Sequence, residues 1–534
     1  MKKIVVYFIL LFITIGTVVG QEFLSPLPTN KDERLTHGIA VYAVNDSFKE
    51  QFTQRLKEEM GKRSTDIQIL KGIEEYPDIL FLLDWNEELV RQAVKEFVIP
   101  VFIHRTKVES AVSQNCHIIR ATDLNASGKA ADFIKKIFYQ GKRPVYSTIF
   151  EDRKEGYFQY RIPSVLALPD GKIIAFAEAR AEGKTDCAEN DIVAKISRDN
   201  GKTWGPMILV AESGEASLNN PTAVYVEEKS RIILMYQQYP PKQSEGSTQT
   251  GFEGDNICRV FISFSDDGGN TWSPKKDITL QAKLPSVTGF ASGPGCGIRV
   301  VSGPDKGRIL MPFNVSGGSN GWFNYLVYSD DLGETWNILP GHSSYGTNES
   351  QVVQLSDTCF MVNARCHRFP GEEAKAPYGW NPWNFSEVTR CRGEIPVSIR
   401  HTHTTWGDTR IRKDMPDPLC QGAIYRYSGL RRGEKSRILF VNPASGLTVP
   451  VDGRSYQRTP PMRMNGTVRV SYDDAGTWSH SKRIYGNRYT GFQYSVLTRL
   501  KEGMVGCIFE ASPQIRFVVF NMEWLTSGED KGEE

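Results

Sequence analysis

The chain has 534 residues, which is too many for one ordinary hydrophobic core, so we expect at least two domains. Its hydrophobic fraction of 40% and charged fraction of 24% are those of a soluble globular protein. A net charge of +2 gives no support for a nucleic-acid partner or an anionic membrane surface, so any bound anion must be held by a local site.

The first twenty residues have the pattern of a secretory signal peptide. Lys2 and Lys3 precede an apolar stretch over 4–15, and the segment ends in Val18-Val19-Gly20. The apolar stretch is short for a transmembrane helix. We therefore expect residues 1–20 to be removed, leaving a secreted or periplasmic protein that begins near Gln21 without stable membrane insertion. An uncleaved membrane anchor is the alternative.

Residues 21–143 are predicted to form a small α/β domain of unknown role. Apolar strands over 37–44, 78–83 and 99–104 alternate with amphipathic helices over 48–61 and 87–97. This alternation favours a largely parallel sheet. The segment carries no phosphate-binding glycine loop, so a nucleotide function has little support. A spacer or docking role, with carbohydrate binding as one option, is the simplest interpretation.

From residue 144 onward short β segments dominate, and one eight-residue pattern recurs. The pattern S-x-D-x-G-x-T-W occurs over 197–204, 265–272 and 329–336, and a fourth copy over 471–478 has Ala475 in place of the glycine. An Asp and a Gly two residues apart favour a tight hairpin turn. The Asp and Ser side chains then cap backbone N–H groups, and the Trp packs under the turn.

The spacing of the copies predicts the number of repeats. The first three copies start 68 and 64 residues apart, and the last gap of 142 residues predicts a degraded copy near residue 400. Residues 399–406 lie there and keep only the final Thr-Trp. Repeats of this length hold four strands each, which is typical of a β-propeller. We expect a mainly β, six-bladed propeller over 144–525, closed by strands near 145–150 and 505–522, and a charged tail over 526–534.

No metal site and no cofactor are predicted. Nine cysteines are spread along the chain without repeated close spacing, and their odd number leaves at least one free thiol. His401 and His403 form an H-x-H pattern, but they stand in the degraded turn. A structural role is therefore favoured over metal ligation, which needs more ligands.

The eight-residue copies resemble the Asp boxes of the sialidase superfamily, and the resemblance to sialidases covers roughly 145–525. Tyr160-Arg161-Ile162-Pro163 is similar to the family's (F/Y)-R-I-P motif, and Tyr494-Ser495-Val496-Leu497 is similar to its Tyr-Ser-x-Leu segment. The resemblance implies a sialidase-like six-bladed propeller with a catalytic site at its mouth.

The same resemblance implies an arginine triad of Arg161, Arg365 and Arg463, with Glu349 preceding Arg365 at the family's spacing. Each guanidinium matches a carboxylate and cannot lose its charge. Three of them would repel one another in a partly dry cleft unless a sugar carboxylate neutralised them. Three other arginines lie close to Arg463 and stay open as alternatives to it: Arg454, Arg458 and Arg469.

The resemblance also implies the catalytic groups. Asp186 is the general acid/base, with Asp191 as the alternative, and Arg180 contacts the ring-hydroxyl region of the sugar. Tyr494 is the nucleophile and Glu349 its base. Because the anomeric carbon carries a carboxylate, a neutral phenol approaches it without the repulsion that an anionic nucleophile would meet. A later glutamate, Glu510, orients Arg161.

Together these residues predict a retaining exo-α-sialidase that removes terminal sialic acids from glycoconjugates through a tyrosyl-sialyl intermediate. Sialylated glycans are its expected partners. One alternative is a hydrolase or trans-glycosidase acting on a related 2-keto sugar acid. A non-catalytic carbohydrate-binding propeller is disfavoured, because a lectin does not need the Asp, Tyr and Glu beside the arginines.

Overall fold

The structure is a computed structural model of the chain. It describes residues 37–61, 67–72, 79–86, 88–90, 93, 99–104, 117–121, 125–139, 144–183, 186–316, 321–366, 391–444, 463–486 and 491–532. The predicted signal peptide and most of the helix predicted over 87–97 lie outside these residues. Among the residues that are described, no helix is long and apolar enough to cross a membrane.

A five-stranded parallel sheet lies near the N-terminus, in the order β2-β1-β3-β4-β5. Its elements are β1 (His37–Tyr42), α2 (Asp46–Met60), β2 (Ile67–Leu70), β3 (Ile79–Leu82), β4 (Ile99–His104), β5 (His117–Arg120) and α4 (Ala126–Tyr139). Alternate strand residues form two apolar clusters, one of them including both helices, so both faces of the sheet are covered. That residues 21–143 form a separate domain stays a prediction.

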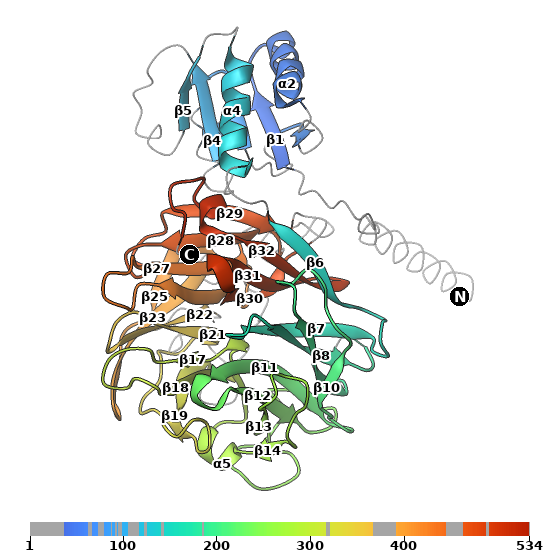
Figure 1. The fold of residues 1–534 in the computed structure, drawn as a ribbon, viewed down its shortest axis with the longest axis vertical. Helices are drawn as coiled ribbons and strands as arrows, with labels where there is room; N and C mark the ends of the chain where they lie inside the picture. The colour runs from blue at the N-terminus through green and yellow to red at the C-terminus, as the bar shows by residue number, and fades with distance from the viewer. Residues whose placement is uncertain are drawn as a thin grey trace, which may run out of the picture.

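The remaining strands form mainly antiparallel sheets in a propeller-like arrangement (Figure 1). The largest sheet contains β7 (Gln159–Ala167), β8 (Ile173–Arg180), β9 (Asn190–Ser197), β10 (Ile208–Ala211), β11 (Ser217–Val226), β12 (Arg231–Tyr239), β13 (Arg259–Ser265), β14 (Lys276–Asp277) and the added β16 (Gly295–Cys296). The next contains β15 (Gly289–Ser292), β17 (Ile298–Arg299), β18 (Ile309–Ser316), β19 (Phe323–Ser329) and β20 (Asn337–Ile338).

Three further sheets complete the arrangement. One contains β21 (Thr347–Gln354), β22 (Cys359–Cys366), β23 (Cys391–Arg400), β24 (His403–Trp406) and β25 (Arg410–Pro416). The next contains β26 (Ala423–Ser428), β27 (Arg437–Pro443), β28 (Gly466–Ser471) and β29 (His480–Tyr485). The last contains β30 (Gln493–Arg499), β31 (Val505–Ala511), β32 (Gln514–Phe520) and β6 (Val145–Glu151). Short helices are η4 (Glu227–Lys229), α5 (Thr279–Ala282), η8 (Lys501–Gly503) and α6 (Met522–Leu525).

The two ends of the propeller region pair in one sheet. β32 runs antiparallel to β6, with Ile515 opposite Phe150 and Val519 opposite Val145. This confirms the prediction that strands from both ends close the structure. First strands of neighbouring sheets also contact one another, and β30 contacts β7. The first and last strands of the propeller region are thereby paired with each other, and no free sheet edge is left between β32 and β6.

The four eight-residue copies fold into the same hydrogen-bonded turn. In the first, Ser197 Oγ donates to Asp199 at 2.8 Å, Gly201 N donates to Ser197 Oγ at 2.9 Å, and Thr203 N donates to Asp199 at 2.9 Å. Copies two to four repeat these bonds. Ala475 adopts a φ of 68° where the other copies have glycine, a conformation that strains a residue with a Cβ.

Two tryptophans of the turns pack against strands that are distant in the sequence. Trp204 meets Phe517 of β32 with ring centres 5.4 Å apart, and Trp272 meets Phe176 of β8 at 5.6 Å. Phe517 belongs to the sheet that contains β6, whereas β8 belongs to the same nine-stranded sheet as β13, the strand that precedes Trp272. The turns therefore also contact strands outside their own hairpins.

The predicted degraded copy is the hairpin between β23 and β24. Its turn has no aspartate of its own at the usual position. Instead His401 N donates to Asp305 at 3.0 Å, and Arg308 donates to His401 O at 2.6 Å. A carboxylate from another loop thus replaces the missing one.

The C-terminal residues are also packed. Asp530 is buried and pairs with Arg437 at 2.8 Å and Lys435 at 3.2 Å. The predicted charged tail is therefore held against β27 by ion pairs.

We expect Asp331→Ala to lower the free energy of unfolding by about 1–3 kcal/mol, because three donors of one turn lose their acceptor. The measurement is denaturant or thermal unfolding, with Glu215→Ala at an exposed position as the control. Equal stability of the two variants would contradict the capping role of the aspartate.

Candidate active site

Four inner strands lose their regular register close to one cavity. The register shifts lie between Arg161 and Ser164 in β7, Asn219 and Thr222 in β11, Thr347 and Ser350 in β21, and Gln493 and Ser495 in β30. Three residues inside these irregularities have positive φ: Ile162 at 50°, Asn220 at 55° and Tyr494 at 41°. Such β-bulges re-aim side chains, and here each delivers a residue to the cavity wall.

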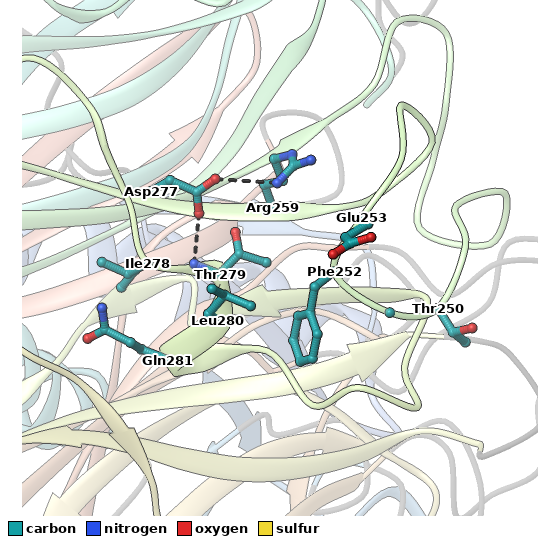
Figure 2. Close-up of a pocket in the computed structure, with 10 residues that line it drawn as sticks. Thr250, Phe252, Glu253, Arg259, Asp277, Ile278, Thr279, Leu280 and Gln281 are labelled. Carbon is teal, nitrogen blue, oxygen red and sulfur yellow. Dashed lines mark hydrogen bonds and ion pairs between the residues drawn. The ribbon is translucent and has the colours of Figure 1, made fainter.

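The cavity has a volume of about 370 Å³. Four of the predicted site residues line it: Asp186, Glu349, Arg365 and Tyr494. A larger hollow of about 680 Å³ lies around Phe252 and Leu280 and contains none of the predicted site residues (Figure 2). The smaller cavity is therefore the candidate active site, since ionisable groups converge there.

Tyr494 and Glu349 form the centre of the site. The Tyr494 hydroxyl donates to Glu349 Oε1 at 2.7 Å, and Arg365 Nη1 lies 2.8 Å from the other Glu349 oxygen. Burial raises the pKa of Tyr494 well above its ordinary 10.0, and Glu349 adds to the rise while Arg463 and Arg365 oppose it. The phenol is therefore neutral at neutral pH and directs its proton at a carboxylate, the arrangement of a nucleophile with its base.

Two more arginines flank the same ring. The Cζ atoms of Arg161 and Arg463 lie 5.3 and 5.4 Å from the Tyr494 ring centre. Arg161 Nε pairs with Glu510 at 2.8 Å, and Glu510 also accepts the Ile162 N–H at 2.7 Å. One carboxylate thereby fixes both the side chain and the bulged backbone of this segment, as expected for the residue predicted to orient Arg161.

Arg463 is held by neutral oxygens. It donates to Gln493 Oε1 at 3.1 Å and to Leu419 O at 2.7 Å. The three guanidinium groups therefore have two carboxylate partners, those of Glu349 and Glu510, so one cation of the cluster has no carboxylate partner of its own, while Glu178, Asp186 and Glu245 line the rest of the cavity. Such a cluster favours an anionic ligand.

Asp186 lies on the accessible side of the cavity. Its side chain is 80% exposed, and it accepts a hydrogen bond from Arg180 Nη2 at 2.7 Å. Arg180 is fully buried and also pairs with Glu178 at 2.8 Å. The structure thus places Arg180 behind Asp186 rather than on the cavity wall, and its direct contact with a sugar stays a prediction.

Glu178 is a site residue that the sequence analysis missed. It lines the cavity and accepts the Asn220 N–H at 2.9 Å. Burial raises its pKa, and Arg180 opposes the rise. Its position two residues before Arg180 on one strand puts both side chains on the same face, which was the available signal. Other lining residues that were missed come from loops and strand ends: Tyr239, Ser244, Glu245, Trp322 and Asn348.

Among the described residues, the alternative candidates for the general acid/base and for the third arginine lie away from the cavity. Asp191 accepts hydrogen bonds from the Tyr157 hydroxyl and the Ser213 N–H, both at 2.7 Å, and is not among the residues that line the cavity. Arg469 donates to Asn442 at 2.9 Å, and burial lowers its pKa to about 10. Arg454 and Arg458 lie outside the described residues. Among the described candidates, Asp186 and Arg463 are the ones that reach the site.

Known proteins resemble this chain in sequence and in fold. The model of a BNR repeat-like domain matches residues 162–373. A sialidase of Micromonospora viridifaciens is 28% identical over 402 residues, covering 72% of this chain and 55% of the relative. An exo-alpha-sialidase of Aspergillus fumigatus is 25% identical over 411 residues, covering 70% and 86%. A sialidase of Paraclostridium sordellii is 32% identical over 249 residues, covering 44% and 59%.

Solved structures share the fold. Hadza microbial sialidase Hz136 superposes with a TM-score of 0.59 at 23% identity, covering 71% of this chain and 69% of that one. A leech intramolecular trans-sialidase gives a TM-score of 0.55 at 18% identity, covering 72% and 71%. The chain spans a little over half the length of the Micromonospora and Paraclostridium relatives.

We expect Glu349→Gln to lower the pKa of Tyr494, because the carboxylate that disfavours the phenolate is removed while Arg365 and Arg463 remain. The measurement is an alkaline titration of tyrosinate absorbance. Subtracting the titration curve of the double variant Glu349→Gln/Tyr494→Phe from that of Glu349→Gln gives the Tyr494 signal without the carboxylate. Subtracting the curve of Tyr494→Phe from that of the wild type gives the reference signal with the carboxylate. An unchanged or higher titration point in Glu349→Gln would show that the charge of Glu349 does not act on the phenol.

Proposed function

This chain belongs to the sialidase family, and we propose that it is a retaining exo-α-sialidase that removes terminal sialic acids from glycoconjugates. The observation that carries the proposal is the convergence in one cavity of a tyrosine–glutamate pair, an exposed aspartate and a cluster of arginines. The named activities of relatives in sequence agree with it.

The arginine cluster suits a sugar that carries a carboxylate at its anomeric carbon. Arg161, Arg365 and Arg463 together exceed the charge of their carboxylate partners, so a bound carboxylate lowers their mutual repulsion. Charge-assisted hydrogen bonds from planar guanidinium groups also fix the orientation of the carboxylate. The anomeric carbon is then presented to the hydroxyl of Tyr494.

In the proposed reaction, Asp186 donates its proton to the glycosidic oxygen as the bond from that oxygen to the anomeric carbon breaks. The Tyr494 oxygen forms a bond to the anomeric carbon, and its proton passes to Glu349 across the 2.7 Å hydrogen bond. Water, deprotonated by Asp186, then displaces the tyrosine, which recovers its proton from Glu349. Two displacements at one carbon give retention of configuration.

We infer that the propeller has six blades. The nine-stranded sheet divides into two four-stranded groups with the added β16, joined between β9 and β11 by one parallel pair, Ser217 with Asn190. With the four other sheets this makes six groups. In addition, a cavity of about 390 Å³ is lined by residues of β7, β11, β21, β26 and β30, the first strands of five of those groups, and of the short strands β16 and β17.

We propose that the protein is exported and that residues 1–20 are its signal peptide, on the basis of the charged and apolar pattern at the N-terminus. Expression in a bacterial host with an export pathway should give mature protein that begins near Gln21. The measurement is N-terminal sequencing of the secreted or periplasmic fraction. Recovery of only the uncleaved chain in the membrane fraction would favour the anchor instead.

We expect Tyr494→Phe and Asp186→Ala each to lower kcat on a fluorogenic α-sialoside by at least about 10²-fold, because each removes a group that takes part in bond making or proton transfer. Asp191→Asn is the matched control and should keep most of the activity, since Asp191 lies away from the cavity lining.

Binding of free sialic acid, measured on the same variants by calorimetry, shows that the cavity remains folded. If the wild-type protein binds sialosides but never cleaves them, the enzymatic proposal is wrong. Cleavage restricted to other ulosonosides would assign the site to a related 2-keto sugar acid.

A further inference from the structure

One loop lines both the candidate active site and the larger hollow beside it. Between β12 and β13, residues 244–246 contribute to the wall of the active-site cavity, and residues 250–253 contribute to the wall of the hollow. Gly246 and Thr250 are four residues apart, so the chain between them spans at most about 14 Å. The segments of the loop that line the two cavities are therefore no more than this distance apart.

The hollow combines apolar and polar groups. Figure 2 shows the ring of Phe252, from the loop, and the side chain of Leu280, from α5, approaching the same space. Leu280 is 77% exposed, so its apolar side chain is accessible to a ligand in this space. On another side Arg259 and Asp277 form an ion pair at 3.5 Å.

These groups match the two kinds of surface on a neutral sugar. A pyranose ring has an apolar face of C–H groups, which packs on an aromatic or aliphatic side chain, and a rim of hydroxyls, which needs hydrogen-bond partners. Arg259 and Asp277 carry opposite charges, and the third charged residue of the lining, Glu253, is a carboxylate. The hollow therefore has no excess positive charge comparable to that of the arginine cluster, and it favours a neutral ligand over a second sugar acid.

The loop is held in place before any ligand binds. Gln249 N donates to Asn256 O at 2.8 Å, and Gly251 N donates to Pro285 O at 2.9 Å. From beneath, the buried ammonium of Lys283 donates to Gly251 O at 2.7 Å. A site whose backbone is already fixed loses less conformational entropy when it binds.

We propose that this hollow is a subsite for the neutral sugars on the leaving-group side of the scissile bond, so that the protein prefers long sialylated oligosaccharides over short sialosides. The proposal rests on the proposed function, because the loop leads from the cavity that would hold the terminal sugar acid.

The first test compares kcat/KM on a sialylated complex-type oligosaccharide with kcat/KM on a fluorogenic monosaccharide sialoside. Phe252→Ala should lower the value for the oligosaccharide about tenfold and leave the value for the short substrate unchanged, because only the long substrate reaches the aromatic ring. Phe252→Tyr should restore it. Leu209→Ala, at an exposed apolar position outside both cavities, is the matched control. Equal losses on both substrates, or no loss on either, would overturn the subsite.

The second test does not depend on catalysis. The same oligosaccharide without its sialic acids is titrated into wild type and Phe252→Ala while protein NMR signals are followed. The proposal requires binding to wild type that Phe252→Ala weakens, and equal behaviour of the two proteins excludes it. Absence of sialoside cleavage by wild type, together with Phe252-dependent binding in this titration, would reject the proposed function and keep the sugar-binding hollow.

Discussion

The excess positive charge around Tyr494 is the constraint on which the rest of the site depends. Arg161, Arg365 and Arg463 come from separate strands or strand ends, and each needs its own anchor to remain near the others. Arg161 and Arg365 are each held by a different carboxylate, and Arg463 is held by neutral oxygens. Mutual repulsion in a partly dry cavity would spread such groups apart, so the surrounding sheets must be rigid. The joined ends of the chain, through β6 and β32, contribute that rigidity.

The irregular ends of the inner strands connect this scaffold to the chemistry. A regular strand alternates its side chains between two faces and cannot direct neighbouring residues toward one axis. The bulges in β7, β11, β21 and β30 break the alternation where the cavity lies. Left-handed conformations at residues with a Cβ, such as Tyr494, cost about 1–3 kcal/mol each. They persist because strand pairing holds the backbone on both sides of each bulge.

The sequence predicted the local features better than the long-range ones. The turns could be predicted because Ser197, Asp199 and Thr203 satisfy one another within eight residues. Regular spacing even located the degraded turn, although its replacement carboxylate, Asp305, stands almost a hundred residues away and left no local signal. Burial of Arg180 and the packing of two tryptophans of the turns also depend on distant residues. Family motifs identified the site residues, but their distances and exposures required the folded chain.

The different exposures of Glu349 and Asp186 indicate how the substrate is oriented in the proposed mechanism. The Glu349 side chain is only 11% exposed, whereas the Asp186 side chain is 80% exposed and is held by the buried Arg180, which also pairs with Glu178. A base that takes a proton from a buried phenol must be shielded, because water would compete for the proton. An acid that protonates a leaving group must face the side from which that group departs. In the proposed mechanism, the sugar acid therefore enters with its carboxylate toward the arginines, and the leaving group lies toward Asp186 and the cavity opening.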